Sequence, residues 1–174
     1  MKSLLSLMVS LSVVTAPGGD ARHLLRVDLE TAALSALPST CFRTHERASE
    51  GSPASEQGLT WVLRDGERGS SMLEPGAPSF VLGDAGRVTL PQQLRGSDAR
   101  FSFQDFQARL EGTSVITRHT SAEIVLTSGE EGWTGTLTLS ARDACRGGTC
   151  QLACEVVLPF TARPVPLRLA SAAR

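Results

Sequence analysis

The stretch WTGTLTLSAR at residues 133–142 alternates strictly between two kinds of side chain. Its odd positions are apolar or small, namely Trp133, Gly135, Leu137, Leu139 and Ala141. Its even positions are polar, namely Thr134, Thr136, Thr138, Ser140 and Arg142. Because successive side chains of a β-strand point to opposite faces, this pattern predicts a strand with one buried face and one face in water.

A second run, residues 150–162, is apolar at its even positions, which are Leu152, Cys154, Val156, Leu158 and Phe160. If Cys145 and Cys150 lie opposite each other across the short glycine-containing loop, the two runs form an antiparallel hairpin. That register pairs Leu139 with Val156, Leu137 with Leu158, and Gly135 with Phe160, whose ring would cover the glycine. A slip by one residue would separate all three pairs, so the pattern specifies the register.

The four cysteines, Cys41, Cys145, Cys150 and Cys154, allow three pairings into two disulfides. On one strand Cys150 and Cys154 would lie about 13 Å apart, beyond disulfide reach. We therefore favour a Cys145–Cys150 bridge, which leaves Cys41 to pair with Cys154. The second bridge would join an early strand to the last one. It predicts a closed or nearly closed antiparallel barrel of about eight or nine strands, with a two-sheet sandwich as the alternative.

The rest of the chain has β-branched and aromatic runs separated by Gly, Pro, Ser and Asp, which is typical of an antiparallel meander and an all-β fold. Besides the two runs above, the expected strands are 40–47, 59–65, 78–83, 86–91, 99–110, 113–120 and 122–128. Residues 29–37, stopped by Pro38, predict one short helix, and residues 48–58 predict a loop.

The N-terminal residues resemble a secretory signal peptide in their physical pattern. Lys2 is followed by an apolar stretch at residues 4–16, and the small residues before Ala16 suit signal peptidase. We expect cleavage after Ala16, or alternatively after Ala21, and a single domain over residues 22–170. The apolar stretch is shorter than the roughly 20 residues of a membrane span. We therefore expect a monomer without a membrane span, in the periplasm or secreted. A buried first helix of a cytosolic protein is the alternative, but it would need a polar face.

Composition excludes some partners. With 41% hydrophobic residues, 20% charged residues and a formal net charge of −1, the 174-residue chain is typical of one globular domain. Nucleic acids and anionic membranes both require a clustered excess of Lys and Arg, so neither is expected as a partner.

No residue pattern indicates a catalytic or metal site. His23, His45 and His119 lie outside any recognisable nucleophile motif. Cys41 and His45 with Cys150 and Cys154 can be written as a zinc site, but disulfides are the stronger hypothesis for an exported protein. Asp143 is interpreted, like other aspartates beside Gly or Ala, as a turn residue. We expect no cofactor.

Three functions remain. The first is a non-enzymatic exported barrel that binds a small apolar or amphipathic ligand, for which the candidate contacts are Trp61, Phe101, Phe103 and Trp133. Packing in the core is the competing role of these rings. The second is a structural, protein-interaction or inhibitor module of the cell envelope that uses loops such as 46–58. The third is a hydrolase, which requires a histidine within hydrogen-bond reach of a serine or carboxylate in a cleft.

Overall fold

The computed structural model describes residues 21–42, 59–66, 70–112, 114–146 and 151–166. The strands in these ranges are β1 (Ala21–Leu29), β2 (Leu59–Asp65), β3 (Ser70–Glu74), β4 (Ser79–Val81), β5 (Arg87–Thr89), β6 (Leu94–Ser97), β7 (Arg100–Glu111), β8 (Ser114–Gly129), β9 (Gly132–Arg146) and β10 (Gln151–Pro164). The helical segments are α1 (Ala32–Ser35) and the 3-10 turns η1 (Ser39–Cys41) and η3 (Gly83–Ala85).

Eight of the strands form a closed antiparallel barrel in the order β1-β10-β9-β8-β7-β6-β3-β2. The remaining strands, β4 and β5, form a separate two-stranded sheet. The expected all-β barrel is therefore confirmed, and the sandwich alternative is wrong because β1 pairs with both β2 and β10 and so completes the ring.

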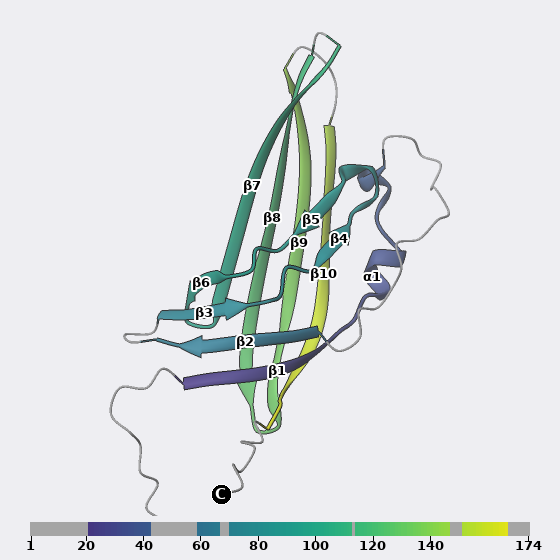
Figure 1. The fold of residues 1–174 in the computed structure, drawn as a ribbon. Coiled ribbons are helices and arrows are strands. Elements are labelled where there is room, and N and C mark those ends of the chain that lie inside the picture. Colours follow the sequence, from purple (N-terminus) through teal and green to yellow (C-terminus); the bar gives the residue numbers. More distant parts are fainter. Residues whose placement is uncertain (1–20, 43–58, 67–69, 113, 147–150, 167–174) are drawn as a thin grey trace, which may run out of the picture.

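The barrel is closed over only part of its length. Strands β7 to β10 have 12 to 16 residues, whereas β2, β3 and β6 have 4 to 7. The short strands cross the lower part of the long ones in Figure 1, and the upper part of the long strands continues as an open four-stranded sheet. β6 pairs with β7 only at Gly96–Phe101 and Ser97–Arg100.

The register of the C-terminal hairpin is confirmed. β9 and β10 pair Leu139 with Val156, Leu137 with Leu158, and Gly135 with Phe160. These leucines and Phe160 are buried, because the apolar faces of both strands point into the barrel. The alternation of both strands, together with the expected placement of Cys145 opposite Cys150, thus predicted the alignment that the structure shows.

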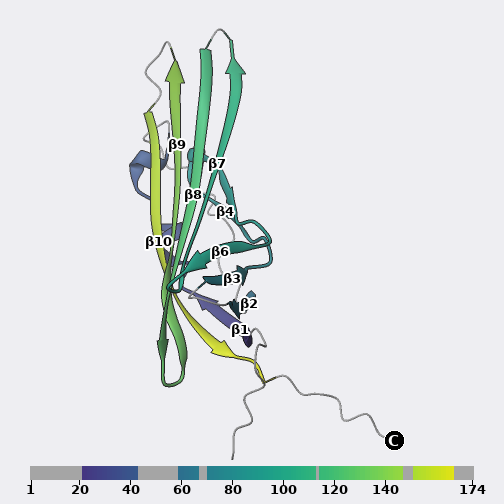
Figure 2. The same ribbon diagram turned by 90° about the vertical axis from the view of Figure 1, so that its left-hand side faces the viewer.

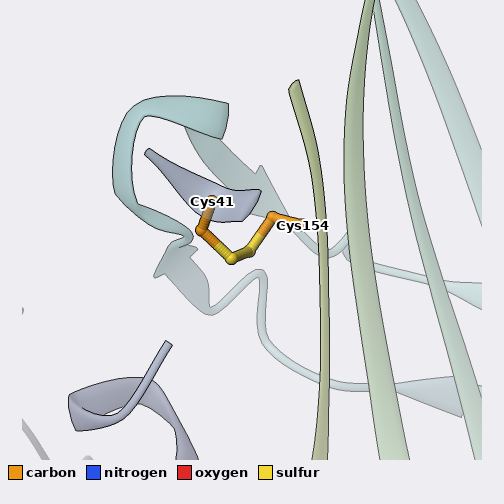
Figure 3. The surroundings of a disulfide bond; sticks show 2 residues. All are labelled: Cys41 and Cys154. Atoms are coloured by element: carbon orange, nitrogen blue, oxygen red, sulfur yellow. A yellow bond between two sulfur atoms is a disulfide. The ribbon is translucent and has the colours of Figure 1, made fainter. Parts of the chain in front are cut away.

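The expected bridge between Cys41 and Cys154 is present and joins residues 113 apart in sequence (Figure 3). The expectation of a strand at 40–47 is wrong where it can be compared, because residues 39–41 form the turn η1. The disulfide therefore ties a 3-10 turn to β10, and strand pairing between β1 and β10 closes the barrel. Cys145 belongs to β9, while Cys150 and the Cys145–Cys150 bridge lie outside the described residues.

Other differences concern element boundaries. The helix expected over 29–37 is reduced to Ala32–Ser35, because Leu29 ends β1 opposite Phe160. Strands β1, β3 and β6 were not expected. The expected strands 113–120 and 122–128 are one continuous strand, β8, in which Ser121 faces outward and its hydroxyl lies 2.8 Å from that of Ser140. The loop expected over 48–58 lies outside the described residues.

A cap covers the inner face of the long sheet beyond the closed part. It consists of α1, η1 and the β4–η3–β5 hairpin, and its buried apolar residues belong to the same core as the barrel interior: Leu34, Leu37, Phe80, Leu82, Val88 and Leu90. An ion pair fastens the hairpin, since Arg118 contacts Asp143 through Nε at 2.7 Å and Nη2 at 2.8 Å and donates to the Asp84 carbonyl at 3.3 Å. Asp143 is therefore a buried residue of β9, and its interpretation as a turn residue is wrong.

Candidate functional site

One end of the barrel has no cap among the described residues and opens into a cavity of about 510 Å³. Three turns bring their residues to this cavity, namely those between β2 and β3, β6 and β7, and β8 and β9. The lining residues are Leu63, Asp65, Gly66, Ser70, Ser71, Asp98, Ala99, Leu126, Thr127, Ser128 and Trp133. We call this cavity the mouth.

The mouth has an apolar floor and a polar rim. Leu63 and Leu126 are buried, and Ala99 and Trp133 pack against the core. Asp65, Ser70, Asp98 and Ser128 are exposed around them. A cavity of a few hundred Å³ with an apolar lining and a few polar groups is the usual form of a small-molecule site.

His23 joins two walls of the mouth. Its Nε2 lies 3.3 Å from Oδ2 of Asp65, and its ring centroid lies 5.3 Å from that of Trp133. Both side chains of this contact are partly exposed, so the contact contributes little to stability but orients the imidazole at the rim.

Two further polar atoms near the mouth are buried without a hydrogen-bond partner among the described residues. One is the Ser71 hydroxyl, on a lining residue, and the other is Nε1 of Trp61. Trp61 precedes Leu63 by two positions on β2 and therefore lies on the same inward face, deeper in the barrel. A buried donor without an acceptor costs about 1–3 kcal/mol, so an acceptor on a ligand in the mouth would be favourable at the Ser71 hydroxyl, whereas Trp61 is fully buried in the barrel interior and does not line the mouth.

The four aromatic residues expected to bind a ligand do not lie together. Trp133 lines the mouth. Trp61 and Phe101 are fully buried, and Trp61 packs edge-on against Phe160 with centroids 5.0 Å apart. Phe103 is partly buried and borders a different hollow. Ligand contact by any of the four stays a prediction.

That second hollow, of about 520 Å³, lies on the outer face of the long sheet. Its walls are mostly polar and include His119, Ser121, Glu123, Ser140 and Arg142. Phe106 packs edge-on against His119, with centroids 4.3 Å apart. Because most of its lining residues are polar, with Phe103, Phe106 and Ala122 as the apolar ones, this hollow is the weaker candidate for an amphipathic ligand.

The structure provides only some of the residue contacts that the hydrolase hypothesis requires. His23 has a carboxylate within reach at a cavity, as that hypothesis requires, whereas His119 is placed against Phe106 and His45 lies outside the described residues. In the part of the chain that the structure describes, no group of three His, Cys, Asp or Glu residues could hold a metal ion. Since Cys41 and Cys154 are bonded to each other, neither can supply the thiolate that the zinc hypothesis needs.

Sequence reasoning found Trp133 but missed His23, Leu63, Ala99 and Leu126 as parts of one site. Leu63 and Leu126 were visible as inward residues of alternating strands. These residues come together only because three connections that are far apart in sequence meet at one end of the barrel. No local sequence pattern predicts that meeting.

The fold defines this chain as a closed eight-stranded antiparallel β-barrel protein. Comparisons with protein-family models, curated proteins and solved structures found no match. None of the helices in the described ranges is long and apolar enough to cross a membrane.

Proposed function

We propose that this protein is exported and binds a small amphipathic molecule in the mouth of its barrel. The observation that carries the proposal is the asymmetry of the two ends, since one is covered by the cap and the other opens into a cavity of about 510 Å³. The apolar floor would take the hydrocarbon part of a ligand, and the polar rim would take its head group.

The ligand belongs in the mouth and not along the barrel axis. Four large side chains of the barrel interior are fully buried in one core cluster, namely Trp61, Phe101, Leu137 and Leu158. Close-packed side chains leave no room for a ligand without displacing part of the core. The ligand is therefore small, and its polar group remains close to solvent.

Export is supported by two independent features. The N-terminal residues have the charge and apolar pattern of a signal peptide. The Cys41–Cys154 disulfide is of a kind that persists in oxidising compartments and is rare in the cytosol.

The envelope interaction module is the second candidate, because a filled interior needs no ligand to be stable. A shortage of space inside the barrel favours this function, whereas the open mouth favours ligand binding. The loop 46–58, which was expected to make its contacts, lies outside the described residues.

Binding of 1-anilinonaphthalene-8-sulfonate, an amphipathic fluorescent probe, tests the ligand proposal on folded mature protein. Ser128→Trp should fill the mouth and weaken binding by about tenfold or more, equivalent to about 1.4 kcal/mol. Ser102→Trp is the matched control, because Ser102 lines the outer hollow and the substitution leaves the mouth unchanged. Absence of probe binding, or a loss in Ser102→Trp alone, would contradict the proposal.

Native mass spectrometry of protein purified from its own host tests export and the natural ligand together. The expected mass begins at Pro17, or at Arg22, and contains a retained small molecule. A chain with an intact N-terminus and reactive thiols would exclude export.

A further inference from the structure

One edge of the long sheet is open. β7 pairs with β8 along its whole length, from Arg100–Val125 to Glu111–Ser114, but with β6 only at its first two residues. Within the described residues, the other edge of β7 has no strand beside it from Ser102 to Glu111. Figure 2 shows β7 as the outermost strand of the upper sheet.

The register identifies the backbone groups on that edge. The amide of Leu126 donates to the carbonyl of Ala99 at 2.9 Å, so Ala99 and Leu126 form a hydrogen-bonded antiparallel pair. Such pairs alternate with non-hydrogen-bonded pairs along a ladder, and the β7–β8 register continues without a bulge. Odd residues of β7 therefore bond to β8, and even residues direct their N–H and C=O groups to the open edge: Ser102, Gln104, Phe106, Ala108 and Leu110.

The opposite edge of the sheet carries protective features that β7 lacks. On β10 a proline, Pro159, interrupts the edge, and the disulfide from Cys154 holds η1 against the strand. β7 has neither lysine nor proline between Ser102 and Glu111. Instead, Phe106 and Leu110 are 58% and 75% exposed on its outer face. Long, exposed edges with apolar side chains are templates for pairing with another strand.

We propose that β7 pairs antiparallel with β7 of a second copy of this chain, about a two-fold axis at Gln107. The result would be a continuous eight-stranded sheet, four strands from each copy. The proposed dimer differs from the monomer expected from the sequence, and the experiments below distinguish the two. A two-fold contact uses the same edge on both copies and so forms a closed assembly.

Charge selects the axis. With Gln107 on the axis, Asp105 of each copy lies opposite Arg109 of the other, and Phe106 lies opposite Ala108. Moving the axis to Asp105 or Arg109 places like charges directly opposite each other, and moving it to Ala108 places Arg109 opposite Gln107, which separates it from Asp105. An axis at Phe106 leaves Arg109 opposite Phe103. Opposite charges across a strand pair are favourable and like charges are not.

Arg109 also lies 3.8 Å from Asp143 of its own chain and remains 42% exposed, so its guanidinium can contact both carboxylates.

Ala108→Pro tests the dimer without disturbing the barrel, because the amide of residue 108 points away from β8. Proline is tolerated on an edge but removes the donor and adds bulk at the interface. Sedimentation equilibrium of the mature protein should show a concentration-dependent dimer that is about 10- to 100-fold weaker in this variant. Wild-type protein that stays monomeric at high micromolar concentration, or an equally strong dimer in a folded Ala108→Pro variant, would overturn the proposal.

Cross-linking tests the axis independently of that variant. Opposed residues of a non-hydrogen-bonded pair lie about 4.5 Å apart between α-carbons, within disulfide range, so Gln107→Cys should yield an oxidised dimer. Gln104→Cys is the matched control, since the two copies of residue 104 would lie about 20 Å apart along the strands. Equal cross-linking by both variants, or by neither in a dimeric sample, would exclude the assigned register. If the protein instead binds vesicles of neutral lipid as a monomer, the exposed apolar residues of β7 contact a membrane surface and the dimer proposal is wrong.

Discussion

The ring of Phe160 lies directly over Gly135 on the neighbouring strand. A β-carbon built on Gly135 would approach Cζ of that ring to 2.6 Å and would come still closer to the carbonyl oxygen of Val125. The same ring packs edge-on against Trp61. The aromatic centre of the barrel therefore requires a residue without a side chain at position 135. Both contacts involve groups that cannot easily move, since one is backbone and the other is fully enclosed.

Gly135→Ala should therefore destabilise the protein by about 3 kcal/mol, near the upper end of the usual cost of overpacking. Urea unfolding followed by Trp fluorescence measures the change. Gly129→Ala is the control, because its added β-carbon would meet only the Gly132 carbonyl oxygen, at 3.6 Å. Equal stability of the two variants would show that the barrel relaxes around position 135.

The Cys41–Cys154 disulfide should stabilise the fold mainly by restricting the unfolded chain. For a separation of 113 residues, the chain-entropy model gives about 4–5 kcal/mol, and the double variant Cys41→Ala/Cys154→Ala should lose stability of that order in urea. A loss below about 1 kcal/mol would contradict this account.

The same double variant tests the second expected bridge. If Cys145 and Cys150 are bonded, adding a reductant to the double variant should lower its stability further. If reductant has no effect on the variant, that bridge is absent.

The parts of the fold that could be predicted are those in which two paired strands both alternate clearly. β9 and β10 satisfy this condition, so their register could be predicted once Cys145 was placed opposite Cys150, and the Cys41–Cys154 pairing followed as the remaining one. β3 and β6 have only 5 and 4 residues, too few for a period of two to stand out. Leu29 was assigned to a helix on local pattern, but its pairing with Phe160 at the barrel seam overrides that preference.

The candidate site was less predictable than the fold. Trp133 was identified as a candidate because it is large and apolar, without any indication of which residues surround it. Asp143 was misinterpreted because its sequence neighbours resemble a turn, and its partner Arg118 is 25 residues away. Arg118 and Asp143 lie directly opposite each other on β8 and β9, so their contact follows from the register of that hairpin and not from the residues that neighbour either one in sequence.

Asp143→Asn should be strongly destabilising. The Asp143 side chain is 1% exposed and that of Arg118 is 17% exposed, so the substitution removes a buried negative charge that lies 2.7 Å from the Arg118 guanidinium. Removing one partner of a buried pair costs about 3–5 kcal/mol, and thermal unfolding would show the loss.

Glu123→Gln is the matched control for that variant. Glu123 pairs with Arg100 at 3.1 Å, but both side chains are well exposed, and such pairs contribute about 0–1 kcal/mol. Similar losses in the two variants would mean that the Arg118–Asp143 pair does not fasten the cap.

Ala99→Gly should raise stability. Asp98 and Ala99 form the turn between β6 and β7 with φ values of 51° and 59°, a left-handed conformation that suits glycine. This conformation costs an L-residue such as Ala99 about 1–2 kcal/mol, and glycine avoids that cost. Part of the gain is lost again, because a glycine gives the unfolded chain more conformational entropy than an alanine does. A net gain of about 1 kcal/mol corresponds to a rise of about 3 °C in Tm, measurable by calorimetry. Ala108→Gly, in the extended strand β7, should instead lower Tm, since glycine brings only its entropic cost there. If Ala99→Gly also lowers Tm, the contact of the Ala99 methyl group with the barrel core outweighs the relief of its backbone.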